Sequence, residues 1–208
     1  MDPTSNAPEV PASSILEAAL KLEDSFSSGG KLLICGNGGS AADASHLAGE
    51  LVKSYERRRP LSAGLAGKLS EYPNERGSML ADRLHLGLPA LSLASDGAVM
   101  SAISNDMGSE LVFAQQVIAL GRAGDVLLCI STSGSSENVI NAAVAARASS
   151  IYVIGLVGDA GSPLARICDL TLASGAGKTS EIQAAHQKAY HHLCTIIETH
   201  LLEGGLRL

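Results

Sequence analysis

The chain has 208 residues, of which 46% are hydrophobic and 17% charged, and its formal net charge is −6. This length suits one compact domain that can bury a full hydrophobic core without further support. The negative charge and an aromatic content of 3% argue against a broad nucleic-acid-binding surface, which needs a basic face or stacking rings. An anionic ligand would therefore have to be held by local donors.

The N-terminus and the cysteines indicate a cytoplasmic protein. Residues 1–12 are predicted to form a flexible tail, and they lack the apolar stretch of a signal peptide. No run approaches 18 uninterrupted apolar residues, so no membrane span is expected. The cysteines are far apart and form no CxxC pair, which predicts reduced, structural thiols. They are Cys35, Cys129, Cys168 and Cys194.

From residue 13 onward, short apolar runs alternate with helical periodicity. Strands are predicted at 31–35, 89–94, 125–131, 151–158 and 169–174. Helices are predicted from Ser13 to Gly29, from the 36–40 turn to about Arg57, and at about 97–104, 109–120, 136–148, 162–166 and 179–202. This order predicts an α/β three-layer sandwich with about five parallel strands, flavodoxin-like or Rossmann-like, in a single domain over 13–208.

One segment, residues 61–88, resists assignment because it mixes glycine, proline and charge, with one short helix around Met79 to Leu86. A segment of this length without a clear period is usually an extra lobe or a functional loop. We therefore treat it as an insertion in the domain.

Two turns rich in glycine and serine follow the first and third predicted strands. They are Gly36–Ser40 (GNGGS) and Ser131–Ser136 (STSGSS), and each leads into a helix. The N-terminus of a helix offers free N–H groups and the positive end of the helix dipole, which favour a phosphate. Either turn alone fits a simple tight turn equally well, with Ser136 capping its helix. Two such turns at neighbouring strand ends predict phosphate binding.

A dinucleotide site is the competing interpretation of the first turn, since Gly36, Gly38 and Ala41 satisfy GxGxxA. That fingerprint also needs an acidic residue about 20 positions later, at the end of a second strand. Glu56 has the spacing but lies in a predicted helix. The dinucleotide interpretation is therefore the weaker of the two.

The helix after the first turn carries Asp43, His46 and Glu50 at i, i+3 and i+7, on one face. His46 and Glu50 could be a metal-ligand pair whose imidazole Asp43 orients, although spacing alone fits a solvated face with a lone histidine better. Gln183 and His191 are eight residues apart on the last helix, about 80° around it and roughly 12 Å along it, so geometry alone does not place them on one metal. The residues alone predict a site for a sugar-phosphate-sized anion and leave a metal open.

Four segments together carry a resemblance to a known family. They are GNGGSAADASHLAGEL at 36–51, SND at 104–106, GDVLLCISTSGSSENVI at 124–140, and IQAAH with His191 at 182–191. The chain resembles the sugar isomerase (SIS) family and, within it, the phosphoheptose isomerases. The resemblance implies an aldose–ketose isomerase of heptose biosynthesis that converts sedoheptulose 7-phosphate to D-glycero-D-manno-heptose 7-phosphate through an enediol. It also implies a homotetramer with active sites near subunit interfaces.

The resemblance further implies roles for residues at matching positions. Glu50 would be the base at carbon, and His191 would move protons between the oxygens. One zinc ion per subunit would be held by His46, Glu50, Gln183 and His191. The residues implied to bind the phosphate and the sugar are Asn37, Gly38, Gly39, Ser40, Asp96, Asn105, Asp106, Ser131, Thr132, Ser133, Ser136 and Gln183.

The chain departs from the family pattern at three places. Ala184 stands where the family usually has a glutamate, Ser54 stands where an arginine is expected, and most of 61–88 is inserted. The alternative function is a non-catalytic SIS protein that binds a sugar phosphate or a partner protein, as the initiator-associating relatives do. Those relatives lose the carboxylate at the Glu50 position, so the presence of Glu50 and His191 favours an enzyme.

Overall fold

The computed structural model describes residues 7–204. The helices are α1 (Ala12–Ser27), α2 (Gly39–Val52), α3 (Ala63–Ser70), α4 (Glu75–Arg83), α5 (Gly97–Asp106), a 3-10 turn η1 (Ser109–Leu111), α6 (Val112–Leu120), α7 (Glu137–Ala148) and α8 (Thr179–Leu202). The strands are β1 (Leu32–Gly36), β2 (Ala90–Ser92), β3 (Val126–Ser131), β4 (Tyr152–Val157) and β5 (Leu170–Ala173).

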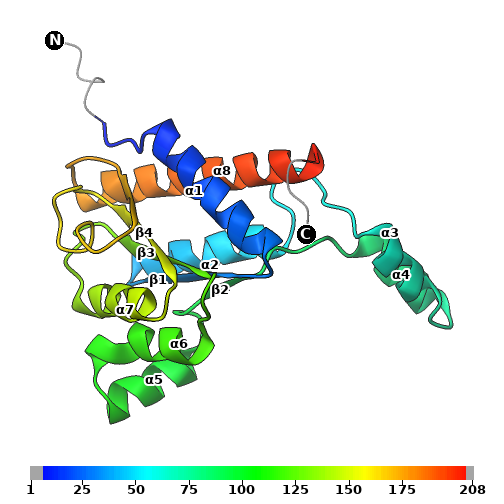
Figure 1. Cartoon of the computed structure of the whole chain (residues 1–208), viewed down its shortest axis with the longest axis horizontal. Coiled ribbons are helices and arrows are strands. Elements are labelled where there is room, and N and C mark those ends of the chain that lie inside the picture. Colours follow the sequence, from blue (N-terminus) through cyan, green and yellow to red (C-terminus); the bar gives the residue numbers. More distant parts are fainter. Residues whose placement is uncertain (1–6, 205–208) are drawn as a thin grey trace.

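The five strands form one parallel sheet in the order β2-β1-β3-β4-β5. Helices α1, α2 and α8 cover one face of this sheet, and α5, α6 and α7 lie on the other (Figure 1). All residues of β1 and β3 are buried, as expected for strands covered on both faces. The predicted α/β three-layer sandwich with five parallel strands is confirmed.

Alternate residues of each strand feed two separate cores, because side chains of a strand point to opposite faces. Ile34 and Leu128 pack under α1, α2 and α8, whereas Leu33 and Leu127 pack against α6 and α7. All four cysteines are free thiols, and burial raises the pKa of Cys168 and Cys194 to about 12.

Helix α2 ends at Val52, so the predicted extension to about Arg57 is wrong. The cause lies on α8, where the buried carboxylate of Glu198 accepts hydrogen bonds from the backbone N–H groups of Tyr55, Glu56 and Arg57 at 2.6–2.9 Å. N–H groups that bond to this carboxylate cannot continue the helical ladder. The chain therefore turns away from α2 at this point.

The short helix predicted at 162–166 is also wrong, since this stretch consists of turns. Leu164 donates its backbone N–H to the carbonyl of Gly134 at 2.9 Å, which ties the stretch to the loop after β3. Five residues are too few for a helix to offset the cost of nucleation by themselves, and this bond holds the stretch in a turn conformation instead.

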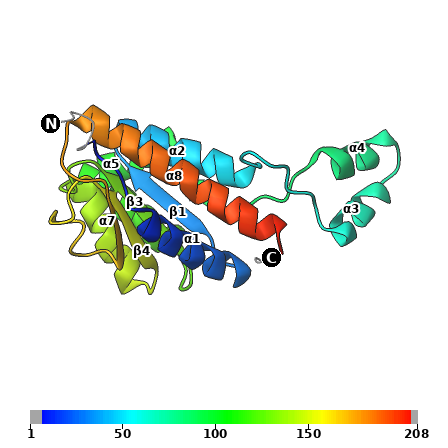
Figure 2. The ribbon, with the colours of Figure 1, turned by 90° about the horizontal axis from the view of Figure 1, so that it is seen from above.

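The insertion at 61–88 forms a helical hairpin, α3 and α4, that projects from the end of α2 away from the sheet (Figures 1 and 2). An antiparallel bridge between Pro60 and His85 holds the two ends of the hairpin together. Helix α4 lies near the predicted short helix, whereas α3 was not predicted. Of the residues in α3 and α4, Gly77 is the one that is buried.

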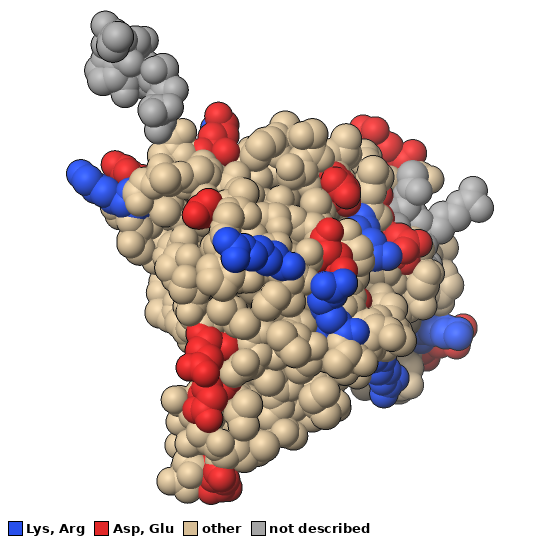
Figure 3. Space-filling view, turned by 60° about the vertical axis from the view of Figure 1, so that its left-hand side comes forward, with Lys and Arg blue, Asp and Glu red and all other residues tan. Residues whose placement is uncertain are grey.

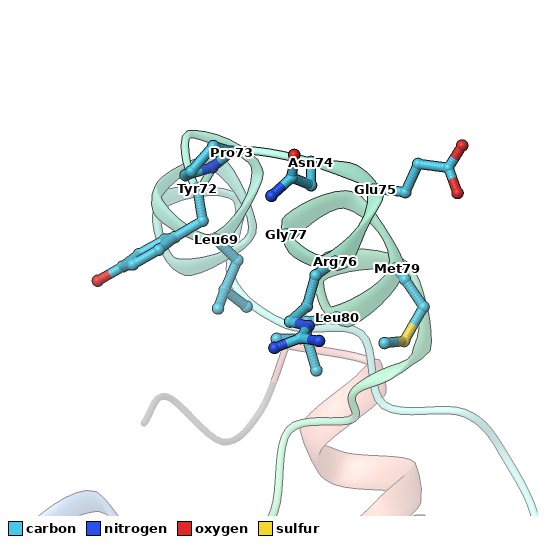
Figure 4. A pocket seen from close by; sticks show the side chains of 9 residues that line it. All are labelled: Leu69, Tyr72, Pro73, Asn74, Glu75, Arg76, Gly77, Met79 and Leu80. Atoms are coloured by element: carbon cyan, nitrogen blue, oxygen red, sulfur yellow. The ribbon is translucent and has the colours of Figure 1, made fainter.

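An open cavity of about 1060 Å³ lies at the tip of this hairpin (Figure 4). Leu69, Arg76 and Leu80 gather beside the two helices, while Tyr72 and Glu75 point away from each other at the rim. This cavity is lined mainly by apolar groups and is remote from the carboxyl ends of the strands. Those strand ends are where ligands bind in sheets of this kind.

Residues 1–6 of the predicted tail lie outside the described residues, and residues 7–11 lie against the body of the domain. Val10 is buried, and Glu9 donates its N–H to the carbonyl of Ser174 at 2.7 Å. No helix within residues 7–204 is both long and apolar enough to cross a bilayer. On the face shown in Figure 3, acidic and basic side chains are interspersed over the surface.

Candidate functional site

The two glycine and serine loops meet at one point of the sheet. Strands β1 and β3 are neighbours, so the loops that follow them emerge side by side at their carboxyl ends. The amides of Asn37 and Asn138 donate to each other at 2.8 and 3.0 Å and join the first loop to the start of α7. Because the sheet order reverses between β1 and β3, this is the place where α/β proteins bind their ligands.

Both helices that follow these loops begin without a side-chain cap. Gly38, at φ +54°, precedes α2, and Ser136 precedes α7. Among the described residues, no side chain accepts a hydrogen bond from the first turn of either helix through these cap positions. The side-chain capping role left open for Ser136 is therefore not realised. The N–H groups of Ser40 and Val139 donate to the carbonyls of Asn37 and Ser136, whereas those of Gly39 and Glu137 are available to an anion.

The hydroxyls of the second loop shape the loop itself. Ser131 Oγ accepts from the N–H of Gly134 at 3.1 Å, and Ser133 Oγ accepts from the N–H of Ser135 at 3.2 Å. Gly134 has φ +60°, and a Cβ there would collide with the side chain of Ser162. Ser136 Oγ has a single long contact, 3.3 Å to Ser131 Oγ, so it is free to turn towards a ligand.

Ser40 and Thr132 complete the two loops, and Gln183 joins the first of them from α8. Ser40 is buried at the start of α2, and the carbonyl of Thr132 accepts from the N–H of Gly158 at 3.2 Å. The amide of Gln183 lies directly over Gly39, where any side chain would displace it. The structure thus places Gln183 at the phosphate loops, two helical turns before His191.

A second group of functional side chains lies further along α2. His46 Nε2 is 3.2 Å from Glu50 Oε1, and Lys53 Nζ contacts the other oxygen of the same carboxylate. The His191 ring comes from α8 and meets the His46 ring edge-on, with centroids 5.2 Å apart. The two residues implied to be catalytic, Glu50 and His191, therefore flank one imidazole. We call His46, Glu50 and His191 the proton-transfer cluster.

Tyr190 is a member of this region that the sequence analysis missed. Its hydroxyl lies 3.0 Å from His46 Nδ1 and donates to Asp43 Oδ1 at 3.3 Å. The expectation that Asp43 orients His46 directly is therefore corrected, because the tyrosine hydroxyl stands between them. Burial raises the pKa of Tyr190, so it stays a phenol at neutral pH. The available signal was its place next to His191 on the inward face of the last helix.

The surroundings of His191 lower its pKa and so favour a neutral imidazole. Burial lowers its pKa first, and the nearby His46 lowers it further, against the opposing effect of the carboxylates around it. The ring of Tyr55 stacks on it, with centroids 5.4 Å apart and planes 21° from parallel. A neutral imidazole can both accept and donate a proton, which a shuttle between two oxygens requires.

Three predicted substrate residues, Asp96, Asn105 and Asp106, lie at the two ends of α5. Asp96 accepts from the N–H groups of Ala98 and Val99 at 2.9 and 3.1 Å and caps α5. Asn105 bonds to Asp106 at 2.8 Å near the other end of α5, roughly 14 Å away along the helix. Each of these side chains makes a local hydrogen bond, and their substrate roles stay a prediction.

The predicted zinc ligands are only partly gathered. His46, Glu50 and His191 are close together, whereas Gln183 is at the phosphate loops. Across residues 7–204, no three His, Cys, Asp or Glu side chains are arranged to hold a metal ion. The donor types suit zinc, but their present arrangement does not complete a site.

Ser54, one of the departures from the family pattern, supports the base of the hairpin. Its hydroxyl accepts from the N–H of Arg59 at 2.8 Å and contacts His85 Nδ1 at 2.8 Å. The buried Arg59 guanidinium donates to the carbonyl of Leu51 at 2.6 Å. An arginine is therefore present near the end of α2, although it comes from position 59.

A parallel sheet with two glycine and serine loops at its switch point, each followed by a helix without a side-chain cap, is typical of α/β domains of the sugar isomerase class. Residues 4–84 and 70–158 match the SIS domain family. The phosphoheptose isomerases of Roseiflexus sp. and Helicobacter hepaticus are 40% and 42% identical over 195 and 191 residues, or 94% and 92% of this chain and 86% and 84% of those proteins. The solved phosphoheptose isomerase of Neisseria gonorrhoeae has a TM-score of 0.73 at 36% identity, and the match covers 90% of this chain and 86% of that one. The chain belongs to the phosphoheptose isomerase family.

Proposed function

We propose that this chain converts sedoheptulose 7-phosphate to D-glycero-D-manno-heptose 7-phosphate. The observation that carries the proposal is the pairing of the uncapped N-termini of α2 and α7 with the Glu50 carboxylate further along α2 and the His191 imidazole on α8. The first element suits a phosphate and the second suits proton transfer next to a carbonyl.

The spacing of the two elements matches the substrate. Six residues separate Ser40 from His46, which is about 9 Å along α2. The seven bonds from phosphorus to C2 of an extended heptulose 7-phosphate span about 9 Å in a zigzag of about 1.5 Å bonds. A phosphate bound at Ser40 therefore places the carbonyl beside the proton-transfer cluster.

The chemistry then follows from the chain's own residues. Glu50 removes the proton from the carbon next to the carbonyl and returns it to the neighbouring carbon. His191 moves a proton between the two oxygens as the enediol forms and collapses. The substrate and product differ only in the positions of these hydrogens, so atoms and electrons balance without a further reactant. Lys53 contacts Glu50 and belongs to the same side of α2.

The direct test is incubation with sedoheptulose 7-phosphate while monitoring formation of an aldose phosphate. Glu50→Gln keeps the shape and removes the base, so turnover should fall by roughly 10²–10⁴-fold. His191→Gln should abolish turnover and leave substrate affinity within a few fold. Glu56→Gln, an exposed carboxylate on the following turn, is the matched control. Wild-type binding without turnover would instead favour the non-catalytic alternative.

We also propose zinc as an auxiliary at this site, with His46, Glu50 and His191 as donors. Zinc would supply polarisation of the carbonyl. Since the donors are not arranged as a complete set, no step above depends on the ion. Metal analysis of the purified protein, together with turnover after dialysis against a chelator, tests this. Full activity in protein without zinc would contradict it.

We propose a homotetramer with active sites near the subunit interfaces, in the cytoplasm. Several large apolar side chains are exposed along α1 and on the hairpin, which is typical of surfaces that are covered in an assembly. They are Leu16, Leu20, Leu65, Tyr72, Met79 and Leu84. Light scattering coupled to size exclusion tests the assembly, and a monomeric mass would contradict it.

A further inference from the structure

Three other rings surround the imidazole of His191. The Tyr55 ring stacks on it, with centroids 5.4 Å apart and planes 21° from parallel. The rings of Tyr190 and His46 stand nearly perpendicular to it, with centroids at 4.8 and 5.2 Å. Within residues 7–204 the side-chain hydrogen bond at His191 goes to its carbonyl, which accepts from Thr195 Oγ1 at 3.2 Å, and none is made by the imidazole nitrogens. Ring packing therefore sets the orientation of this imidazole in the described part of the chain.

Of the three rings, Tyr55 is the one that comes from a turn and not from a helix. Its N–H donates to Glu198 Oε1 at 2.9 Å, which fixes its backbone in the turn after α2. The other oxygen of the same carboxylate accepts from the N–H groups of the next two residues at 2.9 and 2.6 Å. The Tyr55 side chain packs against the core formed with α1, α2 and α8. The stacking ring is thus held both at its backbone and along its side chain.

The carboxylate that holds Tyr55 and the imidazole under its ring belong to the same helix. Glu198 follows His191 by seven residues on α8, which is about two turns, so both side chains leave the same face of this helix. Helix α8 therefore supports the imidazole directly and supports its stacking partner through the turn.

The ring is the part of Tyr55 that acts on His191. Within residues 7–204 the hydrogen bond of Tyr55 is made by its backbone and not by its hydroxyl. Aromatic pairs are attracted in defined geometries, of which the near-parallel stack is one. Placement of a proton-transferring group matters steeply, because a displacement of about 1 Å can cost about a hundredfold in rate.

We propose that Tyr55 is a positioning residue whose ring fixes the plane of the His191 imidazole for proton transfer. The kinetic consequence rests on the proposed isomerase function, whereas the hold of one ring on the other does not. Tyr55 acts through His191 and has no assigned contact with the reacting carbons.

The first test is spectroscopic and needs no turnover. In protein with carbon-13-labelled histidine, a stacked aromatic ring displaces the imidazole signals, and those of His191 are identified by their loss in His191→Gln. All spectra are taken at about pH 8.5, where an ordinary imidazole is neutral. Tyr55→Leu should move the His191 signals towards those of an exposed histidine, and Tyr55→Phe should leave them near their wild-type positions. His191 signals that stay in place in Tyr55→Leu would overturn the proposal.

The second test separates kcat from KM. Tyr55→Leu should lower kcat roughly ten- to hundredfold and leave KM within about threefold, because the phosphate loops are unchanged. Tyr55→Phe keeps the stack, so its kcat should stay within about twofold of the wild type. Tyr152→Leu removes a half-buried tyrosine ring at the start of β4, away from the loops, and should change neither constant. A loss of kcat in Tyr55→Phe as large as in Tyr55→Leu, or a loss in KM alone, would count against a positioning role.

A further variant keeps the proposal testable if Tyr55→Leu folds poorly. Tyr55→Met places a flexible apolar side chain without a ring at the same position. It should give the same movement of the His191 signals and the same loss of kcat. A folded Tyr55→Met with wild-type kcat would refute the positioning role. An inactive wild type in which the ringless variants still move the His191 signals would refute the isomerase function and leave the hold of Tyr55 on His191 standing.

Discussion

Among residues outside the two cores, Glu198 is expected to be the one whose replacement lowers the free energy of unfolding most. Its carboxylate accepts three backbone N–H groups of the turn after α2, at 2.9, 2.9 and 2.6 Å, and is the counter-charge of the buried Arg59, whose Nε is 3.7 Å away. The turn therefore depends on one side chain from α8, more than 140 residues later in the chain.

The magnitude follows from what Glu198→Ala leaves behind. Each charge-assisted hydrogen bond contributes about 1.5–3 kcal/mol, but the three share one carboxylate and do not add fully. Loss of one member of a buried ion pair costs about 3–5 kcal/mol, because the other charge stays buried without a partner. We therefore expect about 3–5 kcal/mol of destabilisation. At about 2.1 cal/mol/K per residue, this lowers the unfolding midpoint of a chain of this size by roughly 10 °C.

Thermal and urea unfolding measure this effect, with two comparisons. Glu198→Gln keeps the volume and one acceptor oxygen, so its loss should be about half as large. Glu17→Gln changes an exposed carboxylate on α1 and should alter the midpoint by less than about 2 °C. Because Tyr55 belongs to the same turn and stacks on His191, Glu198→Ala should also reduce turnover. A Glu198→Ala midpoint within 2 °C or so of the wild type would refute this reasoning.

Three further outcomes are expected. Replacement of residues 62–83 by a short glycine linker should change the unfolding midpoint by only a few degrees. The two ends of the hairpin are already adjacent through the Pro60–His85 bridge, and Gly77 is the one buried residue of α3 and α4. A large drop in the midpoint would show that the hairpin is covered in an assembly. Asn138→Ala should raise KM roughly two- to tenfold without changing kcat, because it removes both hydrogen bonds between Asn37 and Asn138, which join the first loop to the start of α7. An unchanged KM in steady-state assays would argue against this. Burial lowers the pKa of His186, so below about pH 6.5 the unfolded state binds more protons than the folded state, and the free energy of unfolding should fall as the pH drops through that value. His186→Leu should flatten this pH dependence, as measured by urea unfolding at several pH values. An unaltered dependence in His186→Leu would show that another group is responsible.

The central strands β1 and β3 were predictable because each is a short apolar run that is buried on both faces. Local pattern alone locates such runs, as β1 and β3 show. The end of α2 was not predictable, because the residues after Val52 are competent helix formers and Glu198 diverts them from a distance. The same limit explains Tyr190, whose role depends on two partners on another helix.

The helix spacing of Gln183 and His191 does not place both on one metal ion, whereas the family resemblance implies that both belong to one site. The arrangement of α2 and α8 explains this difference. The two helices lie side by side (Figure 2), with Gln183 over Gly39 and His191 against His46. The seven residues from Gly39 to His46 on α2 and the eight from Gln183 to His191 on α8 are both about two turns. Each helix therefore has a residue beside the first glycine and serine loop, and α2 gives two members of the proton-transfer cluster while α8 gives one. Spacing correctly separates Gln183 from His191 within one subunit, and the site roles that the resemblance implies for both residues stay a prediction. The two are compatible because a heptose phosphate is long enough to reach from one pair to the other.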